Sequence, residues 1–346
     1  MPEHMRIIVT GAAGFIGSHA VKALLKSGHS VLAIDNLNDY YDSKLKNDRL
    51  ENIGKSNSFE FEKVDISDHI KINKLFDNYK PMRVLHLAAQ AGVRFSIENP
   101  FSYIESNLKG HLSILEAVRS SASVQHLVYA SSSSVYGNDT DVPFSENARA
   151  DKPASLYAAT KRADELMSES YSSLYKIPQT GLRFFTVYGP WGRPDMAYWL
   201  FAEAILDGRP IKVFNEGRMA RDFTHVDDVV ESLSRLLVVP PGADPGFDRV
   251  AADPARSWAP HCIYNIGNDK PAQLLEMIGF IENAAGRVAE KIFLPMQPGD
   301  VVETWADIAP LEAAVGYRPS TPLAEGLTGF VAWLREWRAV VAAAAS

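Results

Sequence analysis

One tyrosine and one lysine stand four residues apart, at Tyr157 and Lys161, within the segment Leu156–Tyr175, whose pattern predicts a helix. Positions i and i+4 share one face of a helix, so we expect the phenol and the ammonium to lie side by side. A free tyrosine titrates near pH ~10, and a neighbouring cation favours the phenolate, which can act as a general base. The pair is therefore a candidate catalytic base with its support; the alternative is an ordinary exposed pair on a helix.

A run of four serines, Ser131 to Ser134, follows the strand-like segment HLVYASS and precedes Val135-Tyr136-Gly137. Ligands of parallel α/β sheets bind at the carboxyl ends of the strands. A serine hydroxyl at this place can hold the substrate hydroxyl that Tyr157 deprotonates. A polar transition from strand to loop is the alternative, and it accounts for some of these serines but hardly for all four.

A glycine-rich loop follows the first strand-like segment, RIIVT, and opens a helical pattern that runs to Ser27. Glycines allow a tight turn and the close approach of a pyrophosphate, and the helix N-terminus then presents free N–H groups and a partial positive charge. The order strand, loop, helix is the one that a dinucleotide-binding unit requires. The residues of the loop that we expect to contact a dinucleotide are Gly11, Gly14, Phe15, Ile16 and Gly17.

An acidic residue, Asp35, closes the second strand-like segment, SVLAID, at the spacing expected for a ribose-binding carboxylate. Such a carboxylate accepts hydrogen bonds from the adenosine ribose and repels a 2′-phosphate, so we predict NAD rather than NADP as the cofactor. Asp65 and Ile66, after a third strand, stand where the adenine edge would lie. The alternatives are an exposed strand-end residue for Asp35 and an ordinary turn residue for Asp65.

These residues are positioned by alternating strand-like and helical segments, which predict βαβ units. Further strands are expected at FEFEKVDI, RVLHLAA, HLVYASS and QTGLRFF, with helices ending at Tyr79 and Tyr175 and a terminal helix over Leu323–Ala344. The predicted fold is α/β, a Rossmann-type doubly wound parallel sheet with a smaller C-terminal substrate-binding lobe. We place the dinucleotide-binding domain at residues 1–188 and the lobe at 189–346, with some chain crossing back to the sheet. Pro240–Pro260 predicts a long surface loop.

Composition narrows the class of protein. A formal net charge of −7 argues against general nucleic-acid binding, which needs a basic surface, and 46% hydrophobic residues suit a folded core. No apolar run reaches the ~18 residues of a membrane helix, and the first strand begins too early for a signal peptide. Cys262 is the one cysteine, so an internal disulfide and a cysteine–zinc cluster are excluded and a buried thiol is expected. We expect a soluble cytoplasmic protein.

With these motifs in place, the chain resembles the extended short-chain dehydrogenase/reductase family. The matching pieces, between residue 10 and about residue 230, are TGAAGFIGS, Asp35-Asn36, HLAAQAGVR, ASSSSVYG, YAATK, LRFFTVYGPWGRPDMA and ARDFTHVDDVV. Weaker matches, YNIGN and PGDVVETWAD, extend the likeness to about residue 308. Within the family the chain is most similar to UDP-glucuronate 4-epimerases, and the specific part is the LRFFTVYGPWGRPDMA segment together with AAQAGVR.

The resemblance implies a Rossmann NAD domain, a lobe that holds UDP, and a homodimer. It makes Tyr157 the base, Lys161 its support, Ser132 the active-site serine and Ser134 its Ser/Thr partner. Further NAD contacts that it implies are Asn36, Leu87, Ala88, Ala89, Gln90 and Asn107. It places Arg193 and Arg221 at the UDP phosphates, where the planar fork of an arginine suits a phosphate. For Arg221 a salt bridge with Asp222 or Asp227 is the alternative. Helical patterns over Pro100–Ser121 and Leu156–Tyr175 have apolar stripes that suit a bundle shared by two copies, although such stripes more often face the core.

The serine run also bears on the reaction. Family members share a first step, in which the base takes the proton of the sugar 4-hydroxyl while hydride leaves C4 for NAD. A dehydratase or a decarboxylase needs an acidic residue just before the VYG element, where this chain has Ser133 and Ser134. The serines therefore favour 4-epimerisation of UDP-glucuronate. The alternatives are a 4-epimerase of another UDP-hexose (UDP-glucose/galactose or an N-acetyl form), a UDP-glucuronate decarboxylase, and a catalytically silent NAD-binding regulator.

A uronic acid poses a further problem, because its 4-keto form is a β-keto acid that loses CO₂ readily. We predict that Thr186 and Arg94 bind the carboxylate, since Thr186 stands where galactose-type epimerases usually carry Asn; Ser133 is a further substrate contact. For Arg94 the alternative is helix or loop electrostatics. Two features depart from the epimerase pattern, the Pro240–Pro260 stretch and Trp305, which stands where we expect Tyr. We expect both in the lobe that binds the nucleotide sugar.

Overall fold

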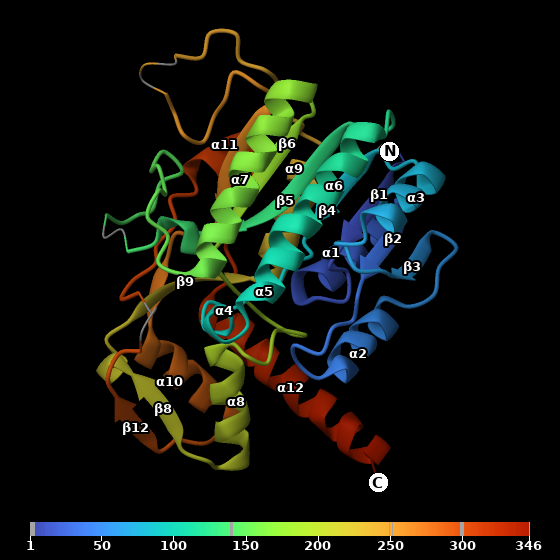
Figure 1. Ribbon diagram of the computed structural model, residues 1–346. Coiled ribbons are helices and arrows are strands. Elements are labelled where there is room, and N and C mark those ends of the chain that lie inside the picture. The colour runs from blue at the N-terminus through green and yellow to red at the C-terminus, as the bar shows by residue number, and fades with distance from the viewer. Residues whose placement is uncertain (1–3, 139–140, 249, 251, 298–300, 346) are drawn as a thin grey trace.

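The computed structural model describes residues 4–138, 141–248, 250, 252–297 and 301–345 (Figure 1). Within the two stretches singled out above, residues 249 and 251 of Pro240–Pro260 and the first three residues of PGDVVETWAD lie outside the described residues.

A seven-stranded parallel sheet forms the larger half of the molecule, in the order β10-β6-β5-β4-β1-β2-β3. Its central strands are almost wholly buried, which explains their near-continuous apolar runs. The α/β doubly wound fold predicted from the sequence is confirmed. The strands are β1 (Arg6–Thr10), β2 (Ser30–Asp35), β3 (Phe59–Lys63), β4 (Arg83–His86), β5 (His126–Ser132), β6 (Gln179–Phe184) and β10 (His261–Ile266).

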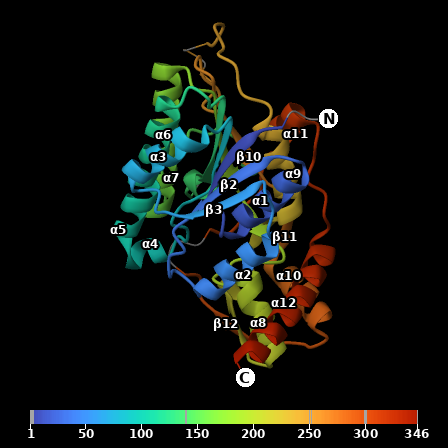
Figure 2. The same ribbon diagram turned by 90° about the vertical axis from the view of Figure 1, so that its right-hand side faces the viewer.

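Helices cover both faces of this sheet, as Figure 2 shows edge-on. One face carries α1 (Phe15–Lys26), α9 (Val226–Leu237) and α11 (Ala309–Val315), and the opposite face carries α3 (His69–Tyr79), α6 (Gly110–Ser120) and α7 (Leu156–Tyr175). The expected single helix over Pro100–Ser121 is in fact α5 (Pro100–Tyr103), a π-helical turn at Ile104–Lys109 and α6. A short α4 (Phe95–Glu98) precedes it.

The smaller lobe lies beyond the carboxyl ends of the strands, at the bottom of Figure 1. It contains a three-stranded sheet, β11-β9-β7, and a two-stranded one, β12-β8. Its core is aromatic, with Trp199 and Phe330 fully buried between helices. Its elements are β7 (Thr186–Tyr188), α8 (Ala197–Asp207), β8 (Ile211–Phe214), β9 (Ala220–His225), β11 (Pro271–Gln273), α10 (Leu274–Ala285), β12 (Lys291–Leu294) and α12 (Leu323–Ala345).

The chain passes between the two halves more than once. Strand β10 and helix α9 lie beyond residue 188 in the sequence but complete the large sheet and one of its faces. The division of the chain at residue 188 stays a prediction. Helix α2 (Ser43–Ile53), which the sequence analysis did not anticipate, packs beside α1 and its Leu45 joins the core of the lobe.

Two expectations about the whole chain can be compared with the structure. Within the described ranges, no helix combines the length and the apolar character that a membrane span requires. Cys262 is buried with a free thiol, as expected, and burial raises the pKa of that thiol.

Candidate active site

A cavity of about 1060 Å³ lies at the carboxyl edge of the large sheet, between it and the lobe. Parallel sheets place their ligand sites at this edge, where the strand order reverses between β1 and β4. The loops after β1, β2, β4 and β5 line the cavity from one side, and the segment after β7 together with β8 lines it from the other. The glycine-rich loop, Asp35, Tyr157 and the serine run therefore share one cavity.

The glycine-rich loop turns tightly beneath the start of α1. Gly11 has a φ of +69°, and a Cβ there would lie 2.7 Å from the nitrogen of Ala88, in the segment after β4, so only glycine fits. Helix α1 begins at Phe15, and no side chain caps its N-terminus. The N–H groups of its first turn remain suited to an anion such as a pyrophosphate.

Asp35 ends β2 beside this loop and is buried. Its carboxylate accepts hydrogen bonds from the backbone nitrogens of Ala13 (3.0 Å) and Leu37 (2.9 Å). The neighbouring Asn36 lines the cavity and donates to Asp65 at 2.8 Å. Although burial opposes it, the hydrogen bonds from Asn36 and Ser67 hold the pKa of Asp65 below its usual range. Asp65 is exposed and does not line the cavity, but it holds Asn36 through this hydrogen bond, while Ile66 lines the cavity itself.

The segment after β4 forms the adjoining wall. Leu87, Ala88, Ala89 and Gln90 all line the cavity. Asn107 is buried behind them, accepting from the Gln90 nitrogen at 2.8 Å and donating to the Gln90 carbonyl at 3.1 Å. Its amide also donates to Thr160 on α7 at 2.9 Å, so it joins this wall to the helix that carries Tyr157. The tight loop, the uncapped helix start and the strand-end carboxylate together fit a dinucleotide.

Tyr157 lies in the first turn of α7, whose N-cap Ser155 accepts a hydrogen bond from the Ala158 nitrogen. Its ring meets Tyr103 edge-on, with 6.0 Å between centroids. Lys161, one turn further on, is buried, and its Nζ donates to the Ala130 carbonyl and to Asp164, both at 3.0 Å. Burial raises the pKa of Asp164 to about 7, although the Lys161 charge opposes this. Asp164 belongs to none of the motifs that the sequence shows.

The four serines divide into two groups. Ser132 and Ser134 face the cavity and share a hydrogen bond of 3.1 Å between their hydroxyls, and Ser133 lines the cavity beside them. Ser131 instead donates to Glu165 at 2.6 Å, and the same carboxylate pairs with Arg183. All four serines line the cavity, but the Ser131 hydroxyl is engaged by Glu165, so the hydroxyls of Ser132, Ser133 and Ser134 are the ones that can reach a ligand.

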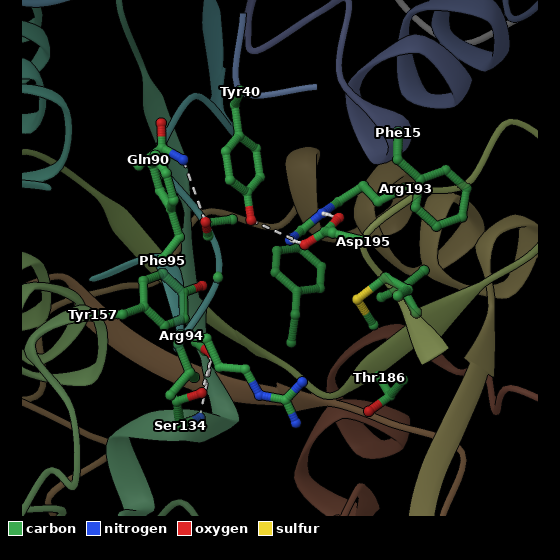
Figure 3. Close-up of a pocket in the computed structure, with 18 of the residues that line it drawn as sticks. Phe15, Tyr40, Gln90, Arg94, Phe95, Ser134, Tyr157, Thr186, Arg193 and Asp195 are labelled. Carbon is green, nitrogen blue, oxygen red and sulfur yellow. Dashed lines mark hydrogen bonds and ion pairs between the residues drawn. The ribbon is translucent and has the colours of Figure 1, made fainter. Parts of the chain in front are cut away.

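The three arginines predicted to bind the substrate, Arg94, Arg193 and Arg221, all line the cavity, and their side chains make different interactions. Arg193 forms a two-pronged ion pair with Asp195. Arg221 donates to the backbone carbonyls of Val301 and Val302 from the segment before Trp305. Arg94 is exposed, and its guanidinium lies 5.7 Å from the ring centroid of Phe214. In the view of Figure 3 it lies between Ser134 and Thr186, and Thr186 lines the cavity from β7.

Two further residues at the site, Tyr40 and Arg49, belong to no motif that predicted them from the sequence. Tyr40, after β2, donates to Asp195 at 3.1 Å across the cavity (Figure 3). Arg49 of α2 is fully buried and donates to carbonyls of both halves, Ala13 at 3.0 Å and Gly192 at 2.6 Å. An arginine in a helix as polar as α2 gives no signal of burial, and a tyrosine after the second strand gives none of an interaction 155 residues away.

As far as the structure describes them, the two departures from the expected pattern are not part of the lining of the cavity. Trp305 donates from its ring to Asp269 at 2.6 Å and is not among the described lining residues. The Pro240–Pro260 stretch connects α9 to the start of β10, at the amino edge of the sheet, and it projects at the top of Figure 1, far from the lobe. The expectation that this stretch belongs to the nucleotide-sugar lobe is wrong, because β10 runs parallel to its neighbours and must be entered from the amino edge.

Comparison with known proteins gives consistent results. The model of the NAD dependent epimerase/dehydratase family matches residues 7–247. Protein CapI of Staphylococcus aureus is 50% identical over 96% of this chain and 99% of its own length. A probable UDP-glucuronate 4-epimerase of Rhizobium meliloti (strain 1021) is 46% identical over 95% of this chain and 96% of its own length. Among solved structures, UDP-glucuronic acid 4-epimerase from Bacillus cereus, in complex with UDP-glucuronic acid and NAD, superposes with a TM-score of 0.85 at 32% identity, covering 96% of this chain and 100% of that one.

Proposed function

The chain belongs to the NAD dependent epimerase/dehydratase family, and from this premise we propose that it is a UDP-glucuronate 4-epimerase that interconverts UDP-glucuronate and UDP-galacturonate. The observation that carries the proposal is that Tyr157, Ser132 and Thr186 line one cavity together with the glycine-rich loop. NAD, when bound, accepts the hydride of sugar C4 and returns it.

The residues of this chain supply the proton transfer and the positioning. Tyr157 removes the proton of the 4-hydroxyl, and the Lys161 ammonium favours its phenolate form. The Ser132 oxygen accepts a hydrogen bond from the Ser134 backbone nitrogen at 3.2 Å. Its hydroxyl turns from Ser134 to the oxygen at C4 and keeps that oxygen near Tyr157. Arg193 and Arg221 hold the diphosphate, so that the sugar can turn its other face to the same hydride while the nucleotide stays anchored.

The acidic residues of the cavity support epimerisation over its neighbouring reactions. Among the lining residues that the structure describes, the carboxylates are Asp35, Glu98 and Asp195. Asp35 is bonded to the dinucleotide loop and Asp195 to Arg193, and Ser133 and Ser134 occupy the place of a dehydratase or decarboxylase acid. Within the described residues, the serine run itself thus carries hydroxyl groups where a dehydratase or a decarboxylase carries its acid, and this supports epimerisation.

Product analysis tests this proposal directly. The purified protein is incubated with UDP-glucuronate, and the products are identified by NMR. UDP-galacturonate should appear without net formation of NADH, and the Tyr157→Phe variant should form almost none. Dominant UDP-pentose would identify a decarboxylase, and conversion of UDP-glucose but not of UDP-glucuronate would identify an epimerase of neutral sugars; either result would contradict the proposal.

We also propose that the protein is a homodimer, joined through the helices α4 to α7. Large apolar side chains on these helices are exposed, among them Phe101 (80%), Ile97 (70%) and Leu166 (57%). Covering such a surface with a second copy removes it from water and follows the family's pattern. Light scattering on the wild type and on Phe101→Glu should show a dimer and a monomer, respectively; a monomeric wild type would contradict the proposal.

We propose the cytoplasm as its location. The buried free thiol of Cys262 supports this, because a reducing compartment suits a chain that contains no disulfide. Fractionation of cells with an antibody against the protein would test it, and recovery outside the cytoplasm would contradict it.

A further inference from the structure

One carboxylate joins the two halves of the molecule across the cavity. Asp195, after β7, accepts the Tyr40 hydroxyl at 3.1 Å and forms an ion pair with Arg193, whose Nε and Nη2 lie 3.1 and 2.5 Å from its two oxygens. Tyr40 belongs to the loop after β2, five residues beyond Asp35. Figure 3 shows the three side chains meeting over the centre of the pocket.

The side chain of Tyr40 is held in place by packing contacts with Phe95 and Gly92. Its ring packs against Phe95 at 4.8 Å between centroids, and its hydroxyl lies where a side chain of Gly92 would begin, 2.6 Å from an ideal Cβ. Gly92 has a φ of +106°, which other residues rarely adopt, so the space for the hydroxyl is kept open. Burial, together with the neighbouring Asp195, raises the pKa of Tyr40 to about 12, and the phenol remains a donor at neutral pH.

The backbone just before Arg193 is also held in place by hydrogen bonds. Buried Arg49 donates to the Trp191 carbonyl at 2.9 Å and to the Gly192 carbonyl at 2.6 Å, and it reaches the dinucleotide loop through Ala13. The segment that carries Arg193 and Asp195 is thus anchored at its base to the cofactor half. The Tyr40 hydroxyl closes the same two halves at a second point, on the cavity side.

We propose that Tyr40, Asp195 and Arg193 form a clasp across the cavity that retains the dinucleotide while the sugar is oxidised. The inference rests on the proposed function, because a 4-epimerase must keep the reduced cofactor until the hydride is returned. Asp195 acts as a positioning residue: it takes two N–H groups of Arg193 and leaves the others directed into the cavity for the diphosphate. Cofactor retention and substrate anchoring are thereby linked through one carboxylate.

The test measures release of NAD from the purified holoprotein, without any sugar. The protein is diluted into a coupled dehydrogenase that consumes free NAD, and the release rate is compared for wild type, Tyr40→Phe and Asp195→Ala. Because each variant loses a hydrogen bond to a charged group, we expect NAD to leave it roughly tenfold faster than it leaves the wild type. Both variants should also purify with less NAD per chain. A Tyr317→Phe variant is the matched control, since it loses a Tyr–Asp hydrogen bond, to Asp228, that lies outside the cavity.

A second measurement follows the clasp during turnover. With UDP-glucuronate, Tyr40→Phe should lose activity progressively and regain it when NAD is added, whereas Tyr317→Phe should behave as wild type. Release rates of both clasp variants equal to those of the control would overturn the proposal, and thermal melts of each variant establish that it is folded. This result is separable from failure of the proposed function, because NAD release is measured without sugar and the products are identified on the wild type.

Discussion

The Lys161 ammonium and the Asp164 carboxylate lie 3.0 Å apart, three residues along α7, and both side chains are at most 4% exposed. The second oxygen of Asp164 is buried and has no hydrogen-bond partner among the described residues. Glu165, the next residue, is by contrast bonded to Arg162, Arg183 and Ser131. Burial therefore opposes the charge of Asp164, and Lys161, the proposed support of Tyr157, is the neighbour that favours it.

Replacing Asp164 should change the pH dependence of catalysis. Burial raises the pKa of Asp164 to about 7, so the carboxyl gains its charge in the range where the enzyme works and then offsets the effect of Lys161 on Tyr157. Asp164→Asn carries no charge at any pH, so the variant removes a negative charge that opposes the Tyr157 phenolate. The acidic limb of the kcat profile should therefore move to lower pH by up to about one unit. The buried histidines His86 and His111, which also face Lys161, have pKa values lowered by burial, to about 3 for His86, and stay neutral in this range.

Glu169→Gln is the control for this prediction. It removes a carboxylate from the same helix that pairs with His261 and not with Lys161. An acidic limb that is unchanged in Asp164→Asn, or displaced equally in both variants, would show that Asp164 does not act on Tyr157. Ultraviolet difference titration of the Tyr157 phenol, with Tyr157→Phe as the blank, gives a readout that is independent of turnover.

The two proposed carboxylate ligands of the sugar can be tested on two substrates. Arg94→Ala and Thr186→Val should lower kcat/KM for UDP-glucuronate by at least about tenfold more than for UDP-glucose, because a charge-assisted contact contributes roughly 1.5–3 kcal/mol. Steady-state kinetics on both sugars measure this difference. Equal losses on the two sugars would remove the carboxylate assignment.

Asp35 should set the choice of dinucleotide. The Asp35 carboxylate lies at the end of β2, where the 2′-phosphate of NADP would meet its negative charge. Asp35→Ser should therefore weaken the binding of NAD. The ratio of the dissociation constants for NADP and NAD should fall by about tenfold or more. Titration calorimetry with both dinucleotides measures the ratio. Glu62→Gln, on the exposed surface of β3, should leave that ratio unchanged.

A buried carboxyl outside the cavity should make stability depend on pH. Glu146 accepts the Asn265 nitrogen with one oxygen, while its second oxygen is buried without a partner among the described residues, and burial raises the pKa of Glu146 to about 7. A carboxyl whose pKa is raised by folding stabilises the protein at acidic pH, and this contribution is lost as the pH rises through about 7. Glu146→Gln cannot ionise, so its free energy of unfolding should exceed that of the wild type by up to about 3 kcal/mol at pH ~9 and differ little at pH ~5. Denaturant unfolding at both values, with exposed Glu276→Gln as the control, measures the effect, and a pH-independent difference would contradict it.

The sequence predicted what local patterns encode. The central strands could be recognised because burial on both faces demands continuous apolar runs, and α7 begins and ends where its pattern does, at Leu156 and Tyr175. The pattern over Pro100–Ser121 did not reveal the π-helical turn that contains Asn107, because side-chain periodicity hardly changes over one such turn. The Tyr40–Asp195 contact and the burial of Arg49 arise from the meeting of distant segments, which no local spacing records.

The position of β10 has a consequence for biosynthesis. This strand is one edge of the large sheet, yet it is translated after the glycine-rich loop, helix α7 and a good part of the lobe. On the ribosome, the exposed side of β6 must wait for residues 261–266 to emerge, and until then it remains open to pairing with other chains. Nascent chains stalled before that point should therefore be prone to aggregation and protease-sensitive, whereas those released shortly after it have every strand of the sheet available.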